Sequence, residues 1–307
     1  MRERLGARPA DSALLRLVLH SGRLPWWLGE FGRHVGRTRG LLTNCGYRMA
    51  IHDAREHIQR CVLRCGAYEP GIASALATIV QPGDIFFDVG ANIGHHSLVA
   101  ASRGAMVHAF EPVPRLASRL QENFRLNKIE DRLVLNVAAV GAEPGTATLY
   151  EATRLDDGSH SLLAGVPASS VQTLAVQVLA LDGYVPANSG VPAVIKIDVE
   201  GYEARVFDGA SALLAASPAP FIILETADRL ADQIGESAGS VLGRLEAKGY
   251  RLFRLDESSP GIEPTTAASS GGELANYLAA HPANPRASAV IGALSLRDDT
   301  GRAMQPW

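Results

Sequence analysis

The stretch from Ile85 to Gly94 reads Ile-Phe-Phe-Asp-Val-Gly-Ala-Asn-Ile-Gly. It is a short apolar strand that ends in an acid and runs into two closely spaced glycines, with a segment that permits a helix behind them. Glycines let the backbone approach a ligand closely, and the amides that begin the next helix favour a negatively charged group. The stretch therefore predicts a ligand site at the carboxyl end of a buried strand.

Further apolar runs alternate with helical patterns along the chain. These runs are apolar throughout rather than at every second residue, as a parallel sheet covered on both faces requires. The pattern predicts a doubly wound α/β sheet. Strands are expected at 107–110, 133–136, 194–197, 221–224, 250–255 and 276–280, and helices at 53–65, 70–81, 97–102, 115–127, 206–214 and 241–247.

The composition fits a globular protein without disulfides. The 307 residues are 47% hydrophobic and 20% charged, which is enough apolar material for a buried core. The three cysteines, Cys45, Cys61 and Cys65, lack a second Cys/His pair for zinc and are expected to be reduced thiols in a cytoplasmic protein. A net charge of −3 argues against a nucleic-acid partner. No apolar run is long enough for a transmembrane segment or a signal peptide.

The charge is distributed unevenly along the chain. Residues 1–64 hold 12 arginines against five acidic residues, a net charge of +7, whereas residues 65–307 carry −10. Apolar residues at helical spacing between 12 and 35, with Trp26 and Trp27, predict two short amphipathic helices. We expect this basic segment to cap the core or to form a homodimer contact; weak peripheral contact with an anionic membrane is the alternative.

A second acid strengthens the ligand prediction. Glu111 follows Asp88 by 23 residues and ends the next strand, where a carboxylate can accept hydrogen bonds from both hydroxyls of a ribose. The glycine spacing departs from the G-x-G-x-x-G of dinucleotide sites, which disfavours an NAD-dependent oxidoreductase. Asp88 would repel a pyrophosphate but suits an ammonium group, as in S-adenosylmethionine.

A third group of polar residues ends the expected fourth and fifth strands. Lys196 and Asp198 point to the same face of a strand, and a lysine within so apolar a run needs a partner. Glu225 ends the neighbouring strand and adds a carboxylate to the same edge of the sheet.

Several motifs in this order resemble the FkbM family of S-adenosylmethionine-dependent methyltransferases. They are the turn from Asp88 to Gly94, Phe110-Glu111-Pro112, Ile195-Lys-Ile-Asp-Val-Glu-Gly-Tyr-Glu203 and Asn276-Tyr277-Leu278. The resemblance implies a class I methyltransferase (Rossmann-like) domain over residues 66–281, with seven strands of which the last is antiparallel. Residues 1–65 would form a basic, helical N-terminal extension and 282–307 a C-terminal tail.

The resemblance also implies a function and site residues. The function is O-methylation of a hydroxyl on a sugar or other natural-product small molecule. The methionyl part of the cofactor would be held by Asp88, Gly90, Asn92 and Gly94, its ribose by Glu111 and its adenine by Asn136, with Asp198 beside the reacting centre.

An aliphatic hydroxyl is a poor nucleophile, so a general base or a metal is expected near the acceptor. The catalytic candidates are Asp198, Glu225, His160 and His96; His160 lies in a polar insertion before the fourth strand, and His96 follows the glycine turn. No metal site is expected, although Asp198 and Glu225 would suit Mg²⁺ if one were used. A noncatalytic or membrane-associated binding protein that keeps this fold is the remaining alternative.

Overall fold

The computed structural model describes residues 40–53, 56–152, 160–162, 171–188, 190–256 and 261–295. The amphipathic helices expected between residues 12 and 35 lie outside these ranges, so their roles in capping, dimerisation or membrane contact stay predictions. Within the described ranges, every helix is too short or too polar to cross a bilayer.

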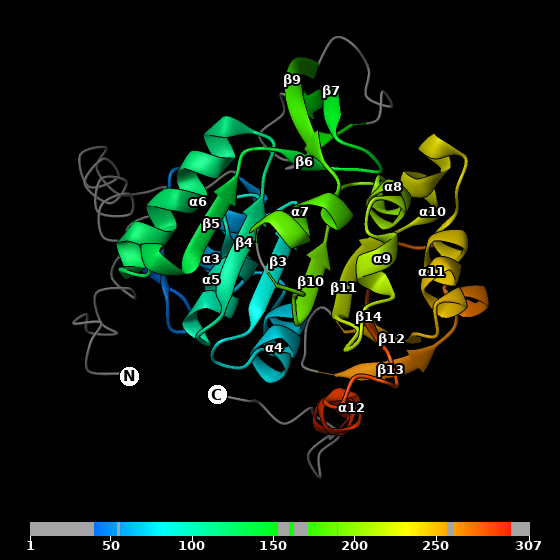
Figure 1. Cartoon of the computed structure of the whole chain (residues 1–307). Coiled ribbons are helices and arrows are strands. Elements are labelled where there is room, and N and C mark those ends of the chain that lie inside the picture. The colour runs from blue at the N-terminus through cyan, green and yellow to red at the C-terminus, as the bar shows by residue number, and fades with distance from the viewer. Residues whose placement is uncertain are drawn as a thin grey trace, which may run out of the picture.

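A mixed sheet of eight strands forms the centre of the molecule (Figure 1). Its strands are β3 (Ile85–Val89), β4 (Met106–Phe110), β5 (Leu133–Asn136), β10 (Val194–Ile197), β11 (Phe221–Thr226), β12 (Arg251–Leu255), β13 (Ile262–Thr265) and β14 (Ala275–Ala280). Their order is β13-β12-β14-β11-β10-β3-β4-β5. The five strands from β11 to β5 are parallel, so their carboxyl ends meet at one edge of the sheet.

The expected number of seven strands is wrong by one, because β13 adds an edge strand beside β12. This strand contains Glu263 and Pro264, and a proline without an N–H is tolerated where a strand pairs on one side only. The expected antiparallel strand is confirmed, since β14 runs antiparallel to both β11 and β12.

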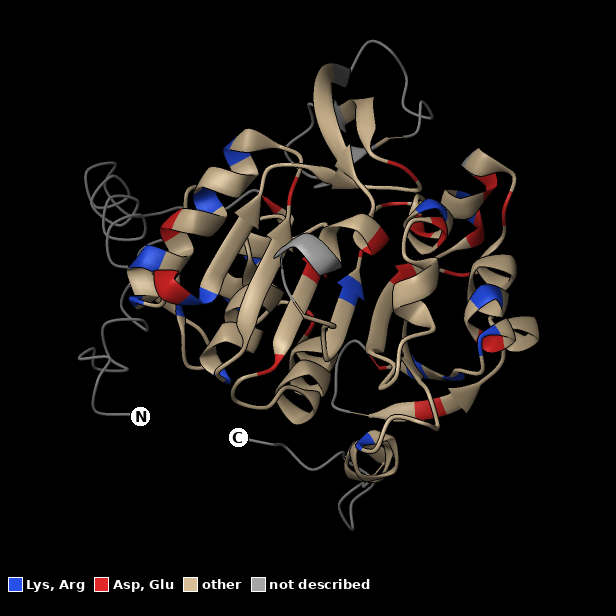
Figure 2. Ribbon diagram, viewed as in Figure 1, with Lys and Arg blue, Asp and Glu red and all other residues tan. Residues whose placement is uncertain are grey.

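Helices cover both faces of the sheet, which confirms the doubly wound α/β fold. Successive strand residues alternate between two hydrophobic cores; Phe86 lies in one and Phe87 in the other. The strands are mostly tan in Figure 2, with charged residues on the helices and near strand ends. The first core is built with α4 (Pro70–Ile79), α5 (His95–Ser102), α6 (Pro114–Asn127) and α12 (Ala287–Ser295), the second with α7 (Leu181–Asn188), α8 (Glu203–Asp208), α9 (Ser211–Leu214) and α11 (Ala238–Ala247).

The described part of the N-terminal extension starts with a hairpin rather than a helix. Strands β1 (Leu41–Leu42) and β2 (Arg48–Met49) pair antiparallel, and α3 (His57–Cys65) follows. Two asparagines of α6 bind the hairpin: Asn127 Oδ1 accepts from Arg48 N at 2.7 Å and Asn123 Oδ1 accepts from Ala50 N at 2.8 Å. This segment is therefore attached to the core. Its three cysteines are free thiols.

A second, smaller sheet is inserted between β5 and α7. It consists of β6 (Ala139–Val140), β7 (Gly145–Ala152), β8 (His160–Ser161) and β9 (Val171–Leu179) in the order β6-β9-β7-β8. Figure 1 shows it above the carboxyl ends of the parallel strands, at the top of the view. The polar insertion expected from the sequence is thus largely a β-structure that stands over the ligand edge of the main sheet.

Candidate active site

The glycine-rich turn between β3 and α5 fits closely against neighbouring strands. The amides of Gly90 and Ala91 both donate to the carbonyl of Phe110, at 3.0 and 3.1 Å. Gly90 has φ +79°, and a Cβ there would lie 1.8 Å from the carbonyl oxygen of Asp198. Asn92 also has a positive φ, of 50°. The backbone at this turn therefore tolerates no side chain at position 90.

Glu111 fastens the turn to the end of β4. Its Oε2 accepts from the amide of Asn92 and its Oε1 from the amide of Val113, both at 2.8 Å. The side chain is 4% exposed, and burial raises its pKa to about 7 in spite of these two amides. Each oxygen keeps a lone pair, so the carboxylate can still accept from a ligand.

Lys196 has the partners that its sequence position requires. Its Nζ lies 3.0 Å from Oδ2 of Asp198 and 3.8 Å from Oδ1 of Asp88 on the neighbouring strand. Burial opposes the charged form of Lys196, but the two carboxylates outweigh it and the pKa of the ammonium is raised. Burial raises the pKa of Asp88, while Lys196 and a 2.6 Å hydrogen bond from Ser97 Oγ oppose that shift. Three strand-end residues thus form one charged network.

Glu225 and Glu200 add acid to this network. Ile197 pairs with Leu224, so Asp198 and Glu225 follow at neighbouring strand ends. The pKa of Glu225 is raised to about 9 by burial and then by Asp198, Glu69 and Glu200. The pKa of Glu200 is raised to about 7 by burial and then by Asp198 and Glu203. The edge of the sheet therefore holds more carboxyl groups than Lys196 could balance if all of them were ionised.

The raised pKa of Glu225 predicts how the free energy of unfolding depends on pH. Because the folded pKa of Glu225, about 9, lies above the ordinary value of 4.5, the folded protein holds a proton that the unfolded chain releases. The free energy of unfolding should therefore fall as pH rises through that window. Urea unfolding at pH about 5, 7 and 9 measures this slope. Glu225→Gln, which cannot titrate, should flatten its upper part, whereas Glu130→Gln on the surface should not. Constant or rising stability above pH about 7 would contradict the assignment.

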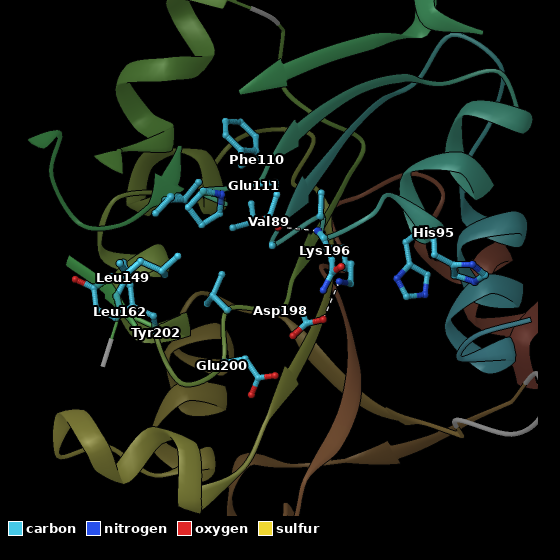
Figure 3. A pocket seen from close by; sticks show the side chains of 18 of the residues that line it. Val89, His95, Phe110, Glu111, Leu149, Leu162, Lys196, Asp198, Glu200 and Tyr202 are labelled. Atoms are coloured by element: carbon cyan, nitrogen blue, oxygen red, sulfur yellow. Dashed lines mark hydrogen bonds and ion pairs between the residues drawn. The ribbon is translucent and has the colours of Figure 1, made fainter. Parts of the chain in front are cut away.

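One pocket opens beside these strand ends (Figure 3). Of the residues predicted for the site, Gly90, Asn92, His96, Glu111 and Asp198 line it. In Figure 3 Lys196 and Asp198 point toward each other, with Glu200 near Asp198. Lining residues that the sequence reasoning did not assign to the site include His57, Tyr68, His95, Leu149, Leu162 and Tyr202.

The other predicted residues lie outside the lining. Asp88 is 1% exposed beneath Lys196 and Ser97. Gly94 begins α5 as its N-cap, with φ +83°. Glu225 stands beside Asp198 at the next strand end. The backbone of His160 forms β8, two residues before the lining residue Leu162, while its side chain is outside the described part of the structure.

Asn136 uses its side chain within the fold. Its Nδ2 donates to the hydroxyl of Tyr184 at 3.1 Å and, more weakly, to the carbonyl of Ala109 at 3.3 Å. Its own carbonyl accepts from the amide of Glu111 at 3.0 Å. The residue therefore positions the Glu111 backbone, and its proposed approach to adenine is untested.

Two buried histidines follow the glycine turn; the sequence indicated His96 as a candidate base but did not assign His95 to the site. His95 Nδ1 lies 2.7 Å from the Tyr47 hydroxyl, and burial lowers its pKa to about 3. His96 Nε2 lies 3.4 Å from Oε2 of Glu69, and burial also lowers its pKa. Both imidazoles are therefore neutral near pH 7. The sequence signal that could have assigned His95 to the site was its place beside His96 directly after the ligand turn, with Tyr68-Glu69-Pro70 upstream.

Among the described residues, no three His, Cys, Asp or Glu side chains are grouped so that they could hold a metal ion. The carboxylates of Asp198 and Glu225 thus have no third ligand of these types within the described ranges.

Comparison with known proteins identifies the family to which the sequence is similar. The family model described as Methyltransferase FkbM domain matches residues 88–252. The curated hexuronic acid methyltransferase AglP of Haloferax volcanii is 27% identical, over 51% of this chain and 62% of the relative. The 31-O-demethyl-FK506 methyltransferase FkbM of Streptomyces tacrolimicus is 32% identical, over 49% of this chain and 64% of the relative. The matches thus span less than two thirds of either relative.

Solved structures with similar folds are more distant. A precorrin-6Y C5,15-methyltransferase from Geobacter metallireducens superimposes with a TM-score of 0.39 and 15% identity, over 68% of this chain and 87% of that one.

Proposed function

Since the chain belongs to the FkbM methyltransferase family, whose model covers more than half of it, we propose that it is an S-adenosylmethionine-dependent O-methyltransferase. Its acceptor would be a hydroxyl group of a sugar or other natural-product small molecule. The relatives support this choice, as one is named for a hexuronic acid and the other for 31-O-demethyl-FK506. The observation that carries the proposal is one pocket lined by Gly90, Glu111 and Asp198, from three adjacent strand ends.

The residues present suit this cofactor. At Gly90 a Cβ would lie 1.8 Å from the carbonyl oxygen of Asp198, so glycine lets the turn lie close against the end of β10, where Asp198 lines the pocket. Glu111 offers carboxylate oxygens to ribose hydroxyls. Among the described residues, Oδ1 of Asp88 lacks a hydrogen bond, and Lys196 Nζ lies 3.8 Å from it, so Asp88 would act on the methionyl part through Lys196 and the turn rather than by direct contact. Gly94 and Asn92 would shape the turn that holds the methionyl part of the cofactor. Asn136 would lie beside its adenine.

In the proposed mechanism, the bound cofactor supplies an electrophilic methyl group on a sulfonium, and the protein aligns and deprotonates the acceptor. Asp198 is the proposed base. Its Oδ2 is held 3.0 Å from Lys196 Nζ, which leaves Oδ1 to take the proton from the acceptor hydroxyl. Glu225, at the next strand end, is the second candidate base; burial and then Asp198 raise its pKa to about 9. His160, whose backbone forms β8 near the pocket, is a further candidate base.

Mass spectrometry of reactions with S-adenosylmethionine and a panel of glycosides and polyketides tests this function. We expect a singly methylated product from at least one acceptor. Asp198→Asn should lower kcat by about 10² to 10⁴, the usual contribution of a general base, while Glu130→Gln leaves it unchanged. Absence of methylated product from every acceptor, or full activity of Asp198→Asn, would contradict the proposal.

The chain divides into the three parts that the sequence predicts. We propose residues 66–281 as the methyltransferase domain, residues 1–65 as a cap that takes part in the acceptor pocket, and residues 282–307 as a tail. His57 and Ile58 of α3 line the pocket, which supports the role of the cap. The helix α12 packs beside α4 and β13, so part of the tail belongs to the core.

A further inference from the structure

The first turn of α3 lies at the mouth of the pocket. His57 and Ile58, which begin the helix, both line the pocket, and His57 is exposed there. The His57 ring packs against the Tyr68 ring with centroids 5.6 Å apart, and the Tyr68 ring lies 5.7 Å from that of His95. His95 directly follows the glycine turn that would hold the methionyl part of the cofactor. The start of α3 therefore stands on the methionyl side of the proposed cofactor site.

The helix itself does little to stabilise this first turn. Among the described residues, its N-cap residue Glu56 makes no side-chain capping hydrogen bond, and no acidic residue stands in the turn. An uncapped first turn leaves backbone amides without helical partners and frays readily. The later part of the helix is better held, because Val62 and Leu63 are buried in the first core. Contacts with other elements must therefore keep the first turn in place.

An ion pair with α6 is one such contact. Arg119 Nη1 donates to both carboxylate oxygens of Glu56, at 2.6 and 2.7 Å, and Arg115 Nη1 lies 3.6 Å from Oε1. The side chains of Glu56 and Arg119 are only 20% and 19% exposed, so water and salt screen this pair less than an exposed one. Gln59 also donates to Glu56. Arg119 itself lies outside the lining of the pocket.

A second set of hydrogen bonds fixes the chain just before the helix. Gln59 is fully buried, and its Oε1 accepts from the amides of His52 and Asp53 at 2.5 and 3.1 Å. His52 Nε2 lies 2.7 Å from Oε2 of Glu122, one turn after Arg119 on α6. Residues three apart share one face of a helix, so one face of α6 supports this segment. Because the other side of α6 is packed in the first core, that support is firm.

We propose that Arg119 is a positioning residue for the cofactor: through Glu56 it holds the first turn of α3, with His57 and Ile58, against the methionyl part. The inference rests on the proposed function. Arg119 would not touch the cofactor itself, since its effect passes through the ion pair. Removing the pair would leave the buried second half of α3 in place but would let the first turn move away from the pocket.

Two ligands that share the adenosyl part test the inference. S-adenosylhomocysteine carries an amino-acid end that corresponds to the methionyl part, whereas 5′-methylthioadenosine lacks it. Isothermal titration calorimetry on the full chain measures both affinities. We expect Arg119→Met to weaken binding of S-adenosylhomocysteine about fivefold and to change that of 5′-methylthioadenosine by less than about twofold.

A double variant shows whether the two side chains act as one unit. Glu56→Gln should weaken S-adenosylhomocysteine binding as Arg119→Met does, and the variant with both changes should bind no more weakly than either single variant, because one ion pair is lost in all three. Glu56→Gln is the milder change and carries the test if Arg119→Met does not fold.

Arg286→Met is the matched control. Arg286 Nη1 lies 2.9 Å from Oδ2 of Asp84, and the two side chains are 24% and 17% exposed, but Asp84 precedes β3 at the amino edge of the sheet, away from the pocket. This variant should lower the thermal unfolding temperature without changing either affinity.

Three results would overturn the inference: unchanged S-adenosylhomocysteine affinity in Arg119→Met, additive losses in the double variant, or an equal loss in Arg286→Met. Failure of S-adenosylhomocysteine to bind the unmodified protein would instead overturn the proposed function and this inference together.

Discussion

Replacing Glu111 with alanine is expected to weaken S-adenosylmethionine binding by about 100-fold or more. The carboxylate would lose its hydrogen bonds to the ribose, and bonds to a charged group contribute about 1.5 to 3 kcal/mol each. The substitution would also leave the amides of Asn92 and Val113 without the carboxylate oxygens that accept their hydrogen bonds at 2.8 Å. Isothermal titration calorimetry measures the affinity.

Two controls separate lost contacts from lost structure. Glu111→Gln keeps the size of the side chain, but its NH₂ group would face one of the two backbone amides, so we expect it to bind the cofactor weakly as well. Glu130→Ala should bind like the unmodified protein. A thermal unfolding curve shows whether each variant is folded. Near-native affinity in a folded Glu111→Ala variant would remove Glu111 from the site.

Replacing Gly90 with alanine is expected to lower the free energy of unfolding by about 3 kcal/mol or more, or to prevent folding. The new Cβ would lie 1.8 Å from the Asp198 carbonyl oxygen, so strand β10 or the turn must move. Because Asp198 ends that strand, the displacement would also remove cofactor binding. Urea unfolding, with soluble yield where the variant does not fold, measures the effect.

Gly83→Ala is the matched control for this substitution. Gly83 has an even larger positive φ, +89°, but a Cβ there would meet nothing within 4 Å. It should therefore cost only the backbone strain, about 1 kcal/mol. If Gly90→Ala and Gly83→Ala were equally stable, the close contact between the turn and Asp198 would not exist in solution.

The parallel centre of the fold could be predicted from the sequence because the strands there are apolar at most positions, on both faces. Strands β3, β5 and β10 have the expected bounds, 85–89, 133–136 and 194–197. The edge strand β13 could not be predicted, since Glu263 and Pro264 interrupt its pattern and only its pairing with β12 makes it a strand. The small sheet was missed for a similar reason, because β7 and β9 stabilise each other across 18 residues.

The residues of the site that depend on local sequence could also be predicted, whereas those that depend on contacts between distant segments could not. The glycine turn and Glu111 were predictable because each is recognised from its place at a strand end. The pairing of Lys196 with both Asp88 and Asp198 depends on the register of β10 with β3, which the sequence does not specify. The placement of Tyr68 and His96 depends on how α4 and α5 pack. The acceptor side of the pocket is therefore the part that required the structure.

We propose that the turn and Glu111 bind S-adenosylmethionine rather than a dinucleotide. Calorimetric titration of the full chain with S-adenosylmethionine, S-adenosylhomocysteine and NAD tests it most directly. We predict that both S-adenosyl compounds bind at one site per chain and that NAD gives no heat of binding. Binding of NAD without binding of either S-adenosyl compound would contradict the account.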